Sequence, residues 1–86
     1  MAKKRTRKLK VFEKKLGREG AVGQCYHTEG IIEIDPRQKQ REYLSTLGHE
    51  VLHCLFPDLS EDEVLEAEVV LARTLWDHGY RRIYVD

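Results

Sequence analysis

Residues 35–63 read DPRQKQREYLSTLGHEVLHCLFPDLSEDE, and they predict a helix that ends in a tight turn. Asp35 stands where a helix cap accepts hydrogen bonds, and Pro36 follows at the first helical position, where the missing N–H of proline costs nothing. Apolar residues then recur at helical spacing up to about Leu55. Because Pro57 cannot continue a helix, we expect the helix to end just before it.

A second helix is predicted to follow directly. Ser60 and Glu63 have the three-residue spacing of a capping box, which marks a helix start. This helix should run to about Asp77, and Gly79 is placed to close it. Since the connection between the two helices is short, they should form an antiparallel hairpin. Residues 80–85 alternate enough to add a last short strand.

Three strands are predicted before the helices. Residues 9–16 and 21–27 alternate like strands, and residues 31–34 form a β-branched run that is typical of one. Turns containing glycine separate them at residues 17–20 and 28–30. The predicted fold class is therefore α+β, with a small antiparallel sheet of about three strands packed on two helices.

The composition indicates one small folded domain. With 86 residues, 41% of them hydrophobic, and only two prolines and six glycines, the chain is neither disordered nor of low complexity. No apolar run approaches the roughly 18 residues of a membrane span, and the basic N-terminus lacks the apolar segment of a secretion signal. Two cysteines are too few for a disulfide framework. We expect a cytoplasmic protein without membrane contact.

The net charge of zero conceals a strong asymmetry. Residues 1–18 carry nine Lys/Arg and one Glu, whereas the remainder carries six Lys/Arg and fourteen acids. We interpret residues 1–8 as a flexible basic arm and residues 9–86 as the single domain. Such an arm can contact nucleic acid or an acidic surface, because neutralised phosphates release counterions. A solvated terminus explains the same charges, since no aromatic residues are interleaved with them.

Residues 49–53, His49-Glu50-Val51-Leu52-His53, form an H-E-x-x-H pattern on the first predicted helix. Histidines four residues apart lie on one helix face and can both reach one Zn²⁺ ion. Glu50 projects about 100° further round, close to a metal-bound water without being a ligand. The pair lies off the apolar stripe of the helix, so core packing does not explain it. His49 and His53 are therefore predicted zinc ligands and Glu50 a predicted general base, with two ordinary solvated histidines as the simpler alternative.

Two acids interrupt the apolar face of the second predicted helix. Glu61 and Glu68 both point into that face, where an unpaired carboxylate is costly and a zinc ion on the neighbouring helix would supply the countercharge. Either acid can reach the gap between the histidines. Glu61 comes first after the turn, so it is the predicted third ligand, with Glu68 as the alternative. Without a metal, Glu61 would stay hydrated at the helix start and Glu68 would pair with an arginine.

These residues resemble the zincin metallopeptidases, in particular the very small phage- and bacteria-encoded zincin-like proteins whose third zinc ligand is a glutamate. The resemblance covers about residues 30–82. It depends most on residues 48–53 (GHEVLH), and further on residues 56–61 (FPDLSE), on Leu75-Trp76 and on Gly79-Tyr80-Arg81.

The resemblance implies a zinc-dependent peptidase. His49, His53 and Glu61 would hold the ion, water would be the fourth ligand, and Glu50 would be the general base. It also implies that the strand at residues 31–34 lies beside the first helix, where an extended peptide could add to the edge of the strand. Larger relatives add a subdomain that completes the substrate cleft, and this chain has none.

Several other polar residues invite a functional role. Four candidates for donating a hydrogen bond to an oxyanion are His27, His78, Tyr80 and Tyr84, each more simply explained as structural. Cys54 directly follows His53, but it projects about 100° away towards the apolar side, as a small buried hydrophobe does. Cys25 has no assigned role.

Two functions are consistent with the sequence. The first is a minimal zinc metallopeptidase, a hydrolase that acts on a peptide or protein. The alternative is a zinc-stabilised binding module without turnover that contacts nucleic acid or protein through the basic arm. Glu50 favours the enzyme, because a purely structural site needs ligands but no base. The missing subdomain favours the module.

Overall fold

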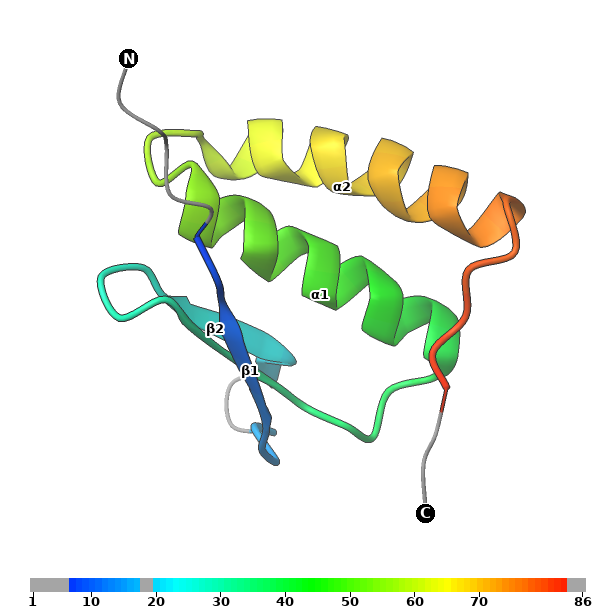
Figure 1. Cartoon of the computed structure of the whole chain (residues 1–86), viewed down its shortest axis with the longest axis horizontal. Helices are drawn as coiled ribbons and strands as arrows, with labels where there is room; N and C mark the ends of the chain where they lie inside the picture. Colours follow the sequence, from blue (N-terminus) through cyan, green and yellow to red (C-terminus); the bar gives the residue numbers. More distant parts are fainter. Residues whose placement is uncertain (1–6, 18–19, 84–86) are drawn as a thin grey trace.

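The chain folds into a small sheet, a central helix and an outer helix (Figure 1). A computed structural model describes residues 7–17 and 20–83. α1 contacts α2, β2 and β3, so it lies between the sheet and the second helix. The elements in chain order are β1 (Lys10–Glu13), β2 (Gly23–Tyr26), β3 (Ile31–Ile34), α1 (Gln40–Leu55) and α2 (Glu61–Asp77). The predicted α+β class is confirmed.

The sheet is mixed, with strand order β1-β3-β2. β2 pairs antiparallel with β3, as predicted, but β1 pairs parallel with β3, so the prediction of an antiparallel sheet is wrong for β1. The reason lies in the connection from β1 to β2, which passes around the end of β3. There the amide of Lys14 donates to Ile34 O at 3.0 Å and the amide of Asp35 donates to Val22 O at 2.8 Å.

The central position of β3 overturns a second expectation. Residues 31–34 pair with β1 on one side and β2 on the other, so this strand has no free edge to which a peptide could add. Its alternation explains the position, because Ile32 and Ile34 are fully buried towards α1. The outer edges of the sheet belong to β1 and β2 instead.

Asp35 does not cap α1 as the sequence predicted. α1 begins at Gln40, and its N-cap residue makes no side-chain hydrogen bond to the helix. The Asp35 carboxylate, 3% exposed, accepts hydrogen bonds from the amides of Leu16 and Arg37, each at 3.0 Å, and from the Arg37 guanidinium at 2.9 and 2.6 Å. Because these four hydrogen bonds engage the carboxylate, Asp35 fastens the segment after β1 to the segment after β3 instead of capping α1.

Both ends of α2 follow the predicted caps. The Ser60 side chain accepts from the amide of Glu63, and the Glu63 carboxylate accepts from the amide of Ser60, which completes the capping box. Gly79 adopts φ of 92°, and its amide donates to Trp76 O at 3.0 Å in a left-handed helix closure. Residues 80–83 form no strand, and the rest of the predicted last strand lies outside the described residues.

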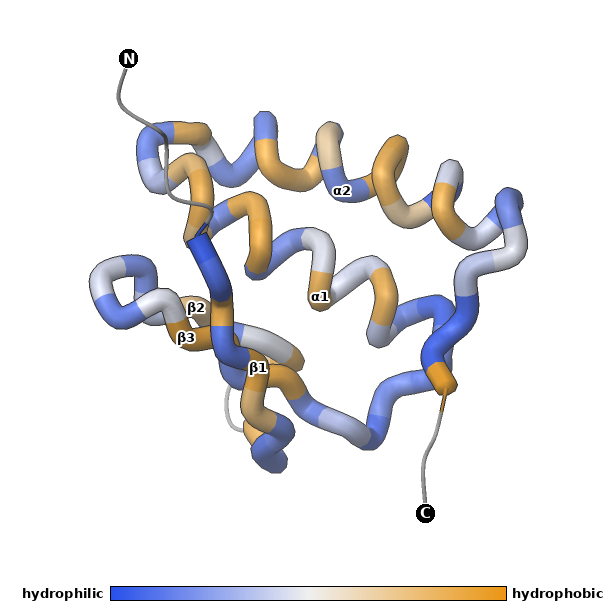
Figure 2. Tube along the Cα trace, in the orientation of Figure 1, coloured by the Kyte–Doolittle hydropathy of each residue, from blue (hydrophilic) through white to orange (hydrophobic). Residues whose placement is uncertain are grey.

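Among the described residues the buried hydrophobic core is small. Its members are Ile32, Ile34, Tyr43, Cys54, Val64 and Ala72. Figure 2 shows hydrophobic residues along the strands and along both helices. Because little apolar surface is buried, hydrogen bonds such as those of Asp35 contribute a larger share of the folding stability. Neither helix of the described segments has the length and apolar character that a membrane crossing requires.

Replacing Asp35 with alanine should lower the melting temperature by about 5–15 °C, because four hydrogen bonds are lost and Leu16 loses its acceptor. The guanidinium of Arg37 and the two amides hold the pKa of Asp35 well below its usual range. The stability it contributes is therefore complete above the unfolded pKa of about 3.9 and is lost as the pH falls below that value towards the folded pKa.

Thermal melts from pH 7 to pH 2 of the wild type, Asp35→Ala and Asp35→Asn check this expectation. The variants should be less stable at neutral pH and should lose less stability on acidification than the wild type does. An unchanged melting temperature in Asp35→Ala would contradict the role assigned to this carboxylate.

Candidate metal centre

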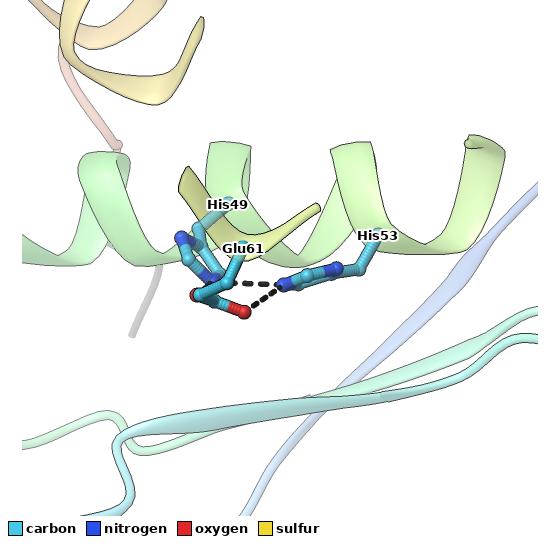
Figure 3. Close-up of side chains that lie close together, drawn as sticks. All are labelled: His49, His53 and Glu61. Atoms are coloured by element: carbon cyan, nitrogen blue, oxygen red, sulfur yellow. Dashed lines mark hydrogen bonds and ion pairs between the residues drawn. The ribbon is translucent and has the colours of Figure 1, made fainter. Parts of the chain in front are cut away.

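Three metal-ligating side chains converge where the two helices meet (Figure 3). His49 and His53 come from α1, and Glu61 is the first residue of α2. The two Nε2 atoms lie 3.1 Å apart, and Glu61 places Oε1 2.9 Å from His49 Nε2 and Oε2 3.0 Å from His53 Nε2. A tetrahedral ion bonded at about 2.0–2.1 Å separates its ligand atoms by roughly 3.3 Å, so a shift of a few tenths of an ångström admits one.

Local structure explains why these atoms meet. The i, i+4 spacing puts both imidazoles on one face of α1. After α1, the amide of Phe56 donates to Leu52 O and the amide of Leu59 donates to Phe56 O, which tightens the turn. The capping box at Ser60 then starts α2 at once and fixes Glu61 above the histidines.

Glu68, the alternative ligand, orients His49 instead of joining the cluster. Its Oε1 lies 2.7 Å from His49 Nδ1, and its Oε2 accepts a hydrogen bond from Ser45 Oγ. Histidine ligands commonly donate their second nitrogen to a carboxylate in this way, which fixes the tautomer and the ring orientation. The structure therefore groups Glu61 with the histidines and places Glu68 behind His49.

The ligating atoms of the cluster are arranged around one point. Nδ1 of His49 faces a carboxylate oxygen of Glu68, so Nε2 is the nitrogen that faces His53 Nε2 and a carboxylate oxygen of Glu61. In the neutral tautomer that carries its proton at Nδ1, an imidazole has its lone pair at Nε2. Several lone pairs aimed at one point repel one another unless a proton or a metal ion lies between them. The donor set of two imidazoles and one carboxylate is one that zinc accepts.

Glu50 lies on the sheet side of the cluster as a buried carboxylate. It is 8% exposed, and burial raises its pKa, partly opposed by the charges of His49 and His53. Glu61 and Glu68 add to the increase. A buried carboxyl with a raised pKa beside side chains that could hold a metal ion is a candidate general base or acid.

Gly23 of β2 makes room for Glu50. A methyl group added at Gly23 would lie 3.1 Å from Glu50 Cγ and 2.7 Å from Thr46 Cγ2, so β2 can approach α1 this closely only with glycine. The sequence analysis assigned Gly23 to a strand but gave it no functional role. A glycine within a strand was the available signal, because it often marks a close approach.

The other candidates serve structure. His27 Nδ1 lies 3.0 Å from Cys54 O, and Arg7 donates to that same carbonyl at 3.0 Å, so both bind the last turn of α1. Arg7 also donates to His27 O, which ties this residue of the basic arm to the fold. His78 and Tyr80 follow the far end of α2, about 25 Å along the helix from Glu61.

Neither cysteine belongs to the cluster. Cys54 is fully buried, as predicted. Burial, together with the hydrogen bond that the Cys25 thiol donates to Cys54, raises the pKa of Cys25 to about 12, so this thiol stays protonated at neutral pH. The metal-ligating group of the described residues consists of His49, His53 and Glu61. Tyr84 and residues 1–6 of the basic arm lie outside the described residues.

Comparisons of the chain with models of protein families, with curated proteins and with solved structures find no match.

Adding a methyl group at Gly23 should disturb Glu50 without removing a ligand. Gly23→Ala should keep the fold at a cost of about 1–3 kcal/mol and leave the metal affinity unchanged. Any hydrolysis that depends on Glu50 should fall by about 100-fold, because small displacements of a reacting group are costly. Gly17→Ala is the control, since its methyl group would meet only the flexible end of Arg37. Equal activity in both variants would contradict the placement of Glu50.

Glu61 and Glu68 are predicted to differ in their effect on metal affinity. Glu61→Ala removes a ligand and should weaken zinc binding by roughly 100-fold or more, whereas Glu68→Ala should cost about 10–100-fold through loss of orientation. Zinc titration against a competing chelator measures both, with the exposed Glu66→Ala as control. A larger loss in Glu68→Ala would reverse the two roles.

Proposed function

We propose that the protein is a zinc-dependent peptidase of minimal size. The observation that supports this most is the convergence of His49, His53 and Glu61 beside the buried carboxylate of Glu50. Three ligands from protein leave the fourth position of a tetrahedral ion to water or substrate, as in catalytic zinc sites. Glu50 has no role in a purely structural site.

Each residue would contribute one property to the reaction. Zinc in such a site lowers the pKa of a coordinated water and polarises a carbonyl group. Glu50 would accept the proton of the attacking water and deliver it to the departing amine. Glu68 would hold the imidazole of His49, with Ser45 fixing the carboxylate in turn.

The free edge of β2 is the proposed position for a peptide substrate. β2 is an outer strand of the sheet, and Gly23 brings its start against Glu50. An extended peptide added to this edge would make main-chain hydrogen bonds and pass its carbonyl groups in front of the histidines. This placement replaces the edge of residues 31–34, which β1 and β2 occupy.

A zinc-stabilised binding module without turnover is the second candidate. One observation favours this module: none of the candidate oxyanion donors that the structure describes lies at the cluster, and a peptidase needs such a donor. His27 binds Cys54 O, and His78 and Tyr80 follow the far end of α2. In this alternative the basic arm would contact nucleic acid or a protein. A cytoplasmic location, which two free thiols suit, also remains a proposal.

Glu50→Gln separates the two candidates. The amide preserves the shape of the side chain but cannot accept a proton, so we expect about one zinc per chain, an unchanged fold and loss of hydrolysis. Mass-spectrometric metal analysis after mild dialysis gives the zinc content, and parallel digests of a peptide library give the cleavage. His53→Ala is the control that should lose the metal.

Four outcomes decide the proposal. Cleavage by the wild type alone supports the peptidase. Equal cleavage by both proteins contradicts the general-base role of Glu50, and zinc without cleavage by either favours the binding module. A folded wild type that takes up no zinc would remove the basis of both candidates.

A further inference from the structure

A second concave surface lies on the opposite side of α1 from the metal centre. It is an open, mainly apolar groove of about 750 Å³, which is within the usual range for ligand sites. Leu44 and Leu47 of α1 form its floor, Val11 and Glu13 of β1 one wall, and Trp76 of α2 the other. None of the metal-centre residues lines it.

The β1 wall of this groove offers unpaired backbone groups. The amides of Lys10 and Lys14 donate towards β3, so the alternating residues Val11 and Glu13 direct their amide and carbonyl groups to the outer edge. Within the described residues no element pairs with that edge. Val11 and Phe12 are 43% and 52% exposed there. An apolar strand edge of this kind is a template for a further strand.

The Trp76 wall carries positive charge. The guanidinium carbon of Arg81 lies 3.4 Å from the centre of the Trp76 ring and that of Arg41 lies 5.5 Å from it. Neither arginine forms an ion pair with any other residue of the described segments, whereas Arg82 is paired with Glu13 at 2.5 Å. Arg81 lines the groove, and its Nη1 donates to Trp76 O and Tyr80 O, which holds the guanidinium beside the ring. Arg81 and the neighbouring Arg41 therefore place positive charge where it would attract an anionic group.

The geometry points to an extended, apolar peptide with an acidic end as the occupant of this groove. It would add to β1 as a fourth strand, with alternate apolar side chains over Leu44 and Leu47 and a carboxylate at Arg81. The strand edge favours a polypeptide over a fatty acid, which has no groups to pair with Val11. A second copy fits less well, because lysines lie in and directly around its own β1 (Lys8, Lys10, Lys14 and Lys15) and its Glu13 is already paired.

Synthetic peptides test this site directly. The probes are fluorescein-labelled hexapeptides in which threonine alternates with valine or leucine. Each probe carries one aspartate, at the N-terminus in one probe and at the C-terminus in the other, so that both strand directions are covered. Anisotropy titrations use the full chain carrying Glu50→Gln, with a chelator present, so that binding is measured without metal or cleavage. At least one probe should bind with a micromolar dissociation constant, and its lysine-ended counterpart should bind about tenfold more weakly.

Two variants locate the binding on the groove. Val11→Pro removes an outward amide that β3 does not use, so it should abolish binding while circular dichroism shows an intact fold. Arg81→Glu should weaken binding of the acid-ended probe by about tenfold, and Arg73→Glu, which makes the same charge change at an exposed site outside the groove, should not.

The remaining outcomes overturn the inference. The inference fails if neither probe binds up to about 1 mM, or if Val11→Pro leaves the binding intact. It also fails if the groove binds the fatty acid laurate but no peptide, or if sedimentation without peptide shows a dimer that depends on Val11. Because the assay contains no metal, none of these results bears on the proposed peptidase.

Discussion

The structure depends on the burial of α1 between two neighbours. This helix packs against the sheet on one side and against α2 on another, and within the described part of the chain it is the element that contacts both layers. Small residues make the contact with α2 close, since a methyl group at Gly48 would lie 3.3 Å from Leu71 Cδ2. Tyr43 and Cys54 of α1 are buried, and so are Ile32 and Ile34 of β3, which the helix covers. Two other strips of the α1 surface carry the candidate metal centre and the apolar groove.

Those two strips have opposite chemistry. One carries His49 and His53, whose Nε2 atoms converge with a carboxylate of α2 at a spacing that suits a shared metal ion. The other carries Leu44 and Leu47, which line an apolar groove with arginines beside it. Because β3 occupies the centre of the sheet, β2 and β1 form its two outer edges within the described residues. These two edges are the positions at which we propose that extended chains bind.

The sequence by itself determined α2, β3 and most of the candidate site. Helix periodicity and the Ser60 capping box fixed α2 to within a residue, and the β-branched run fixed β3 at residues 31–34. The histidine pair was predictable because the i, i+4 relation is set by helix geometry alone. Glu61 was preferred over Glu68 because the short turn brings it to the histidines first. These features depend on neighbours in the chain, where local stereochemistry decides.

Only the tertiary structure decided how the strands pair and what the polar residues around the cluster do. β1 lies parallel to β3, and the Asp35 carboxylate binds the amide of Leu16 beyond β1 and the Arg37 side chain beyond β3 instead of capping α1. Glu68 orients His49 and Gly23 admits Glu50 through contacts between residues far apart in sequence. Such contacts follow from the docking of α2 and of the sheet on α1. No periodicity encodes them, since each depends on the distance between two packed elements.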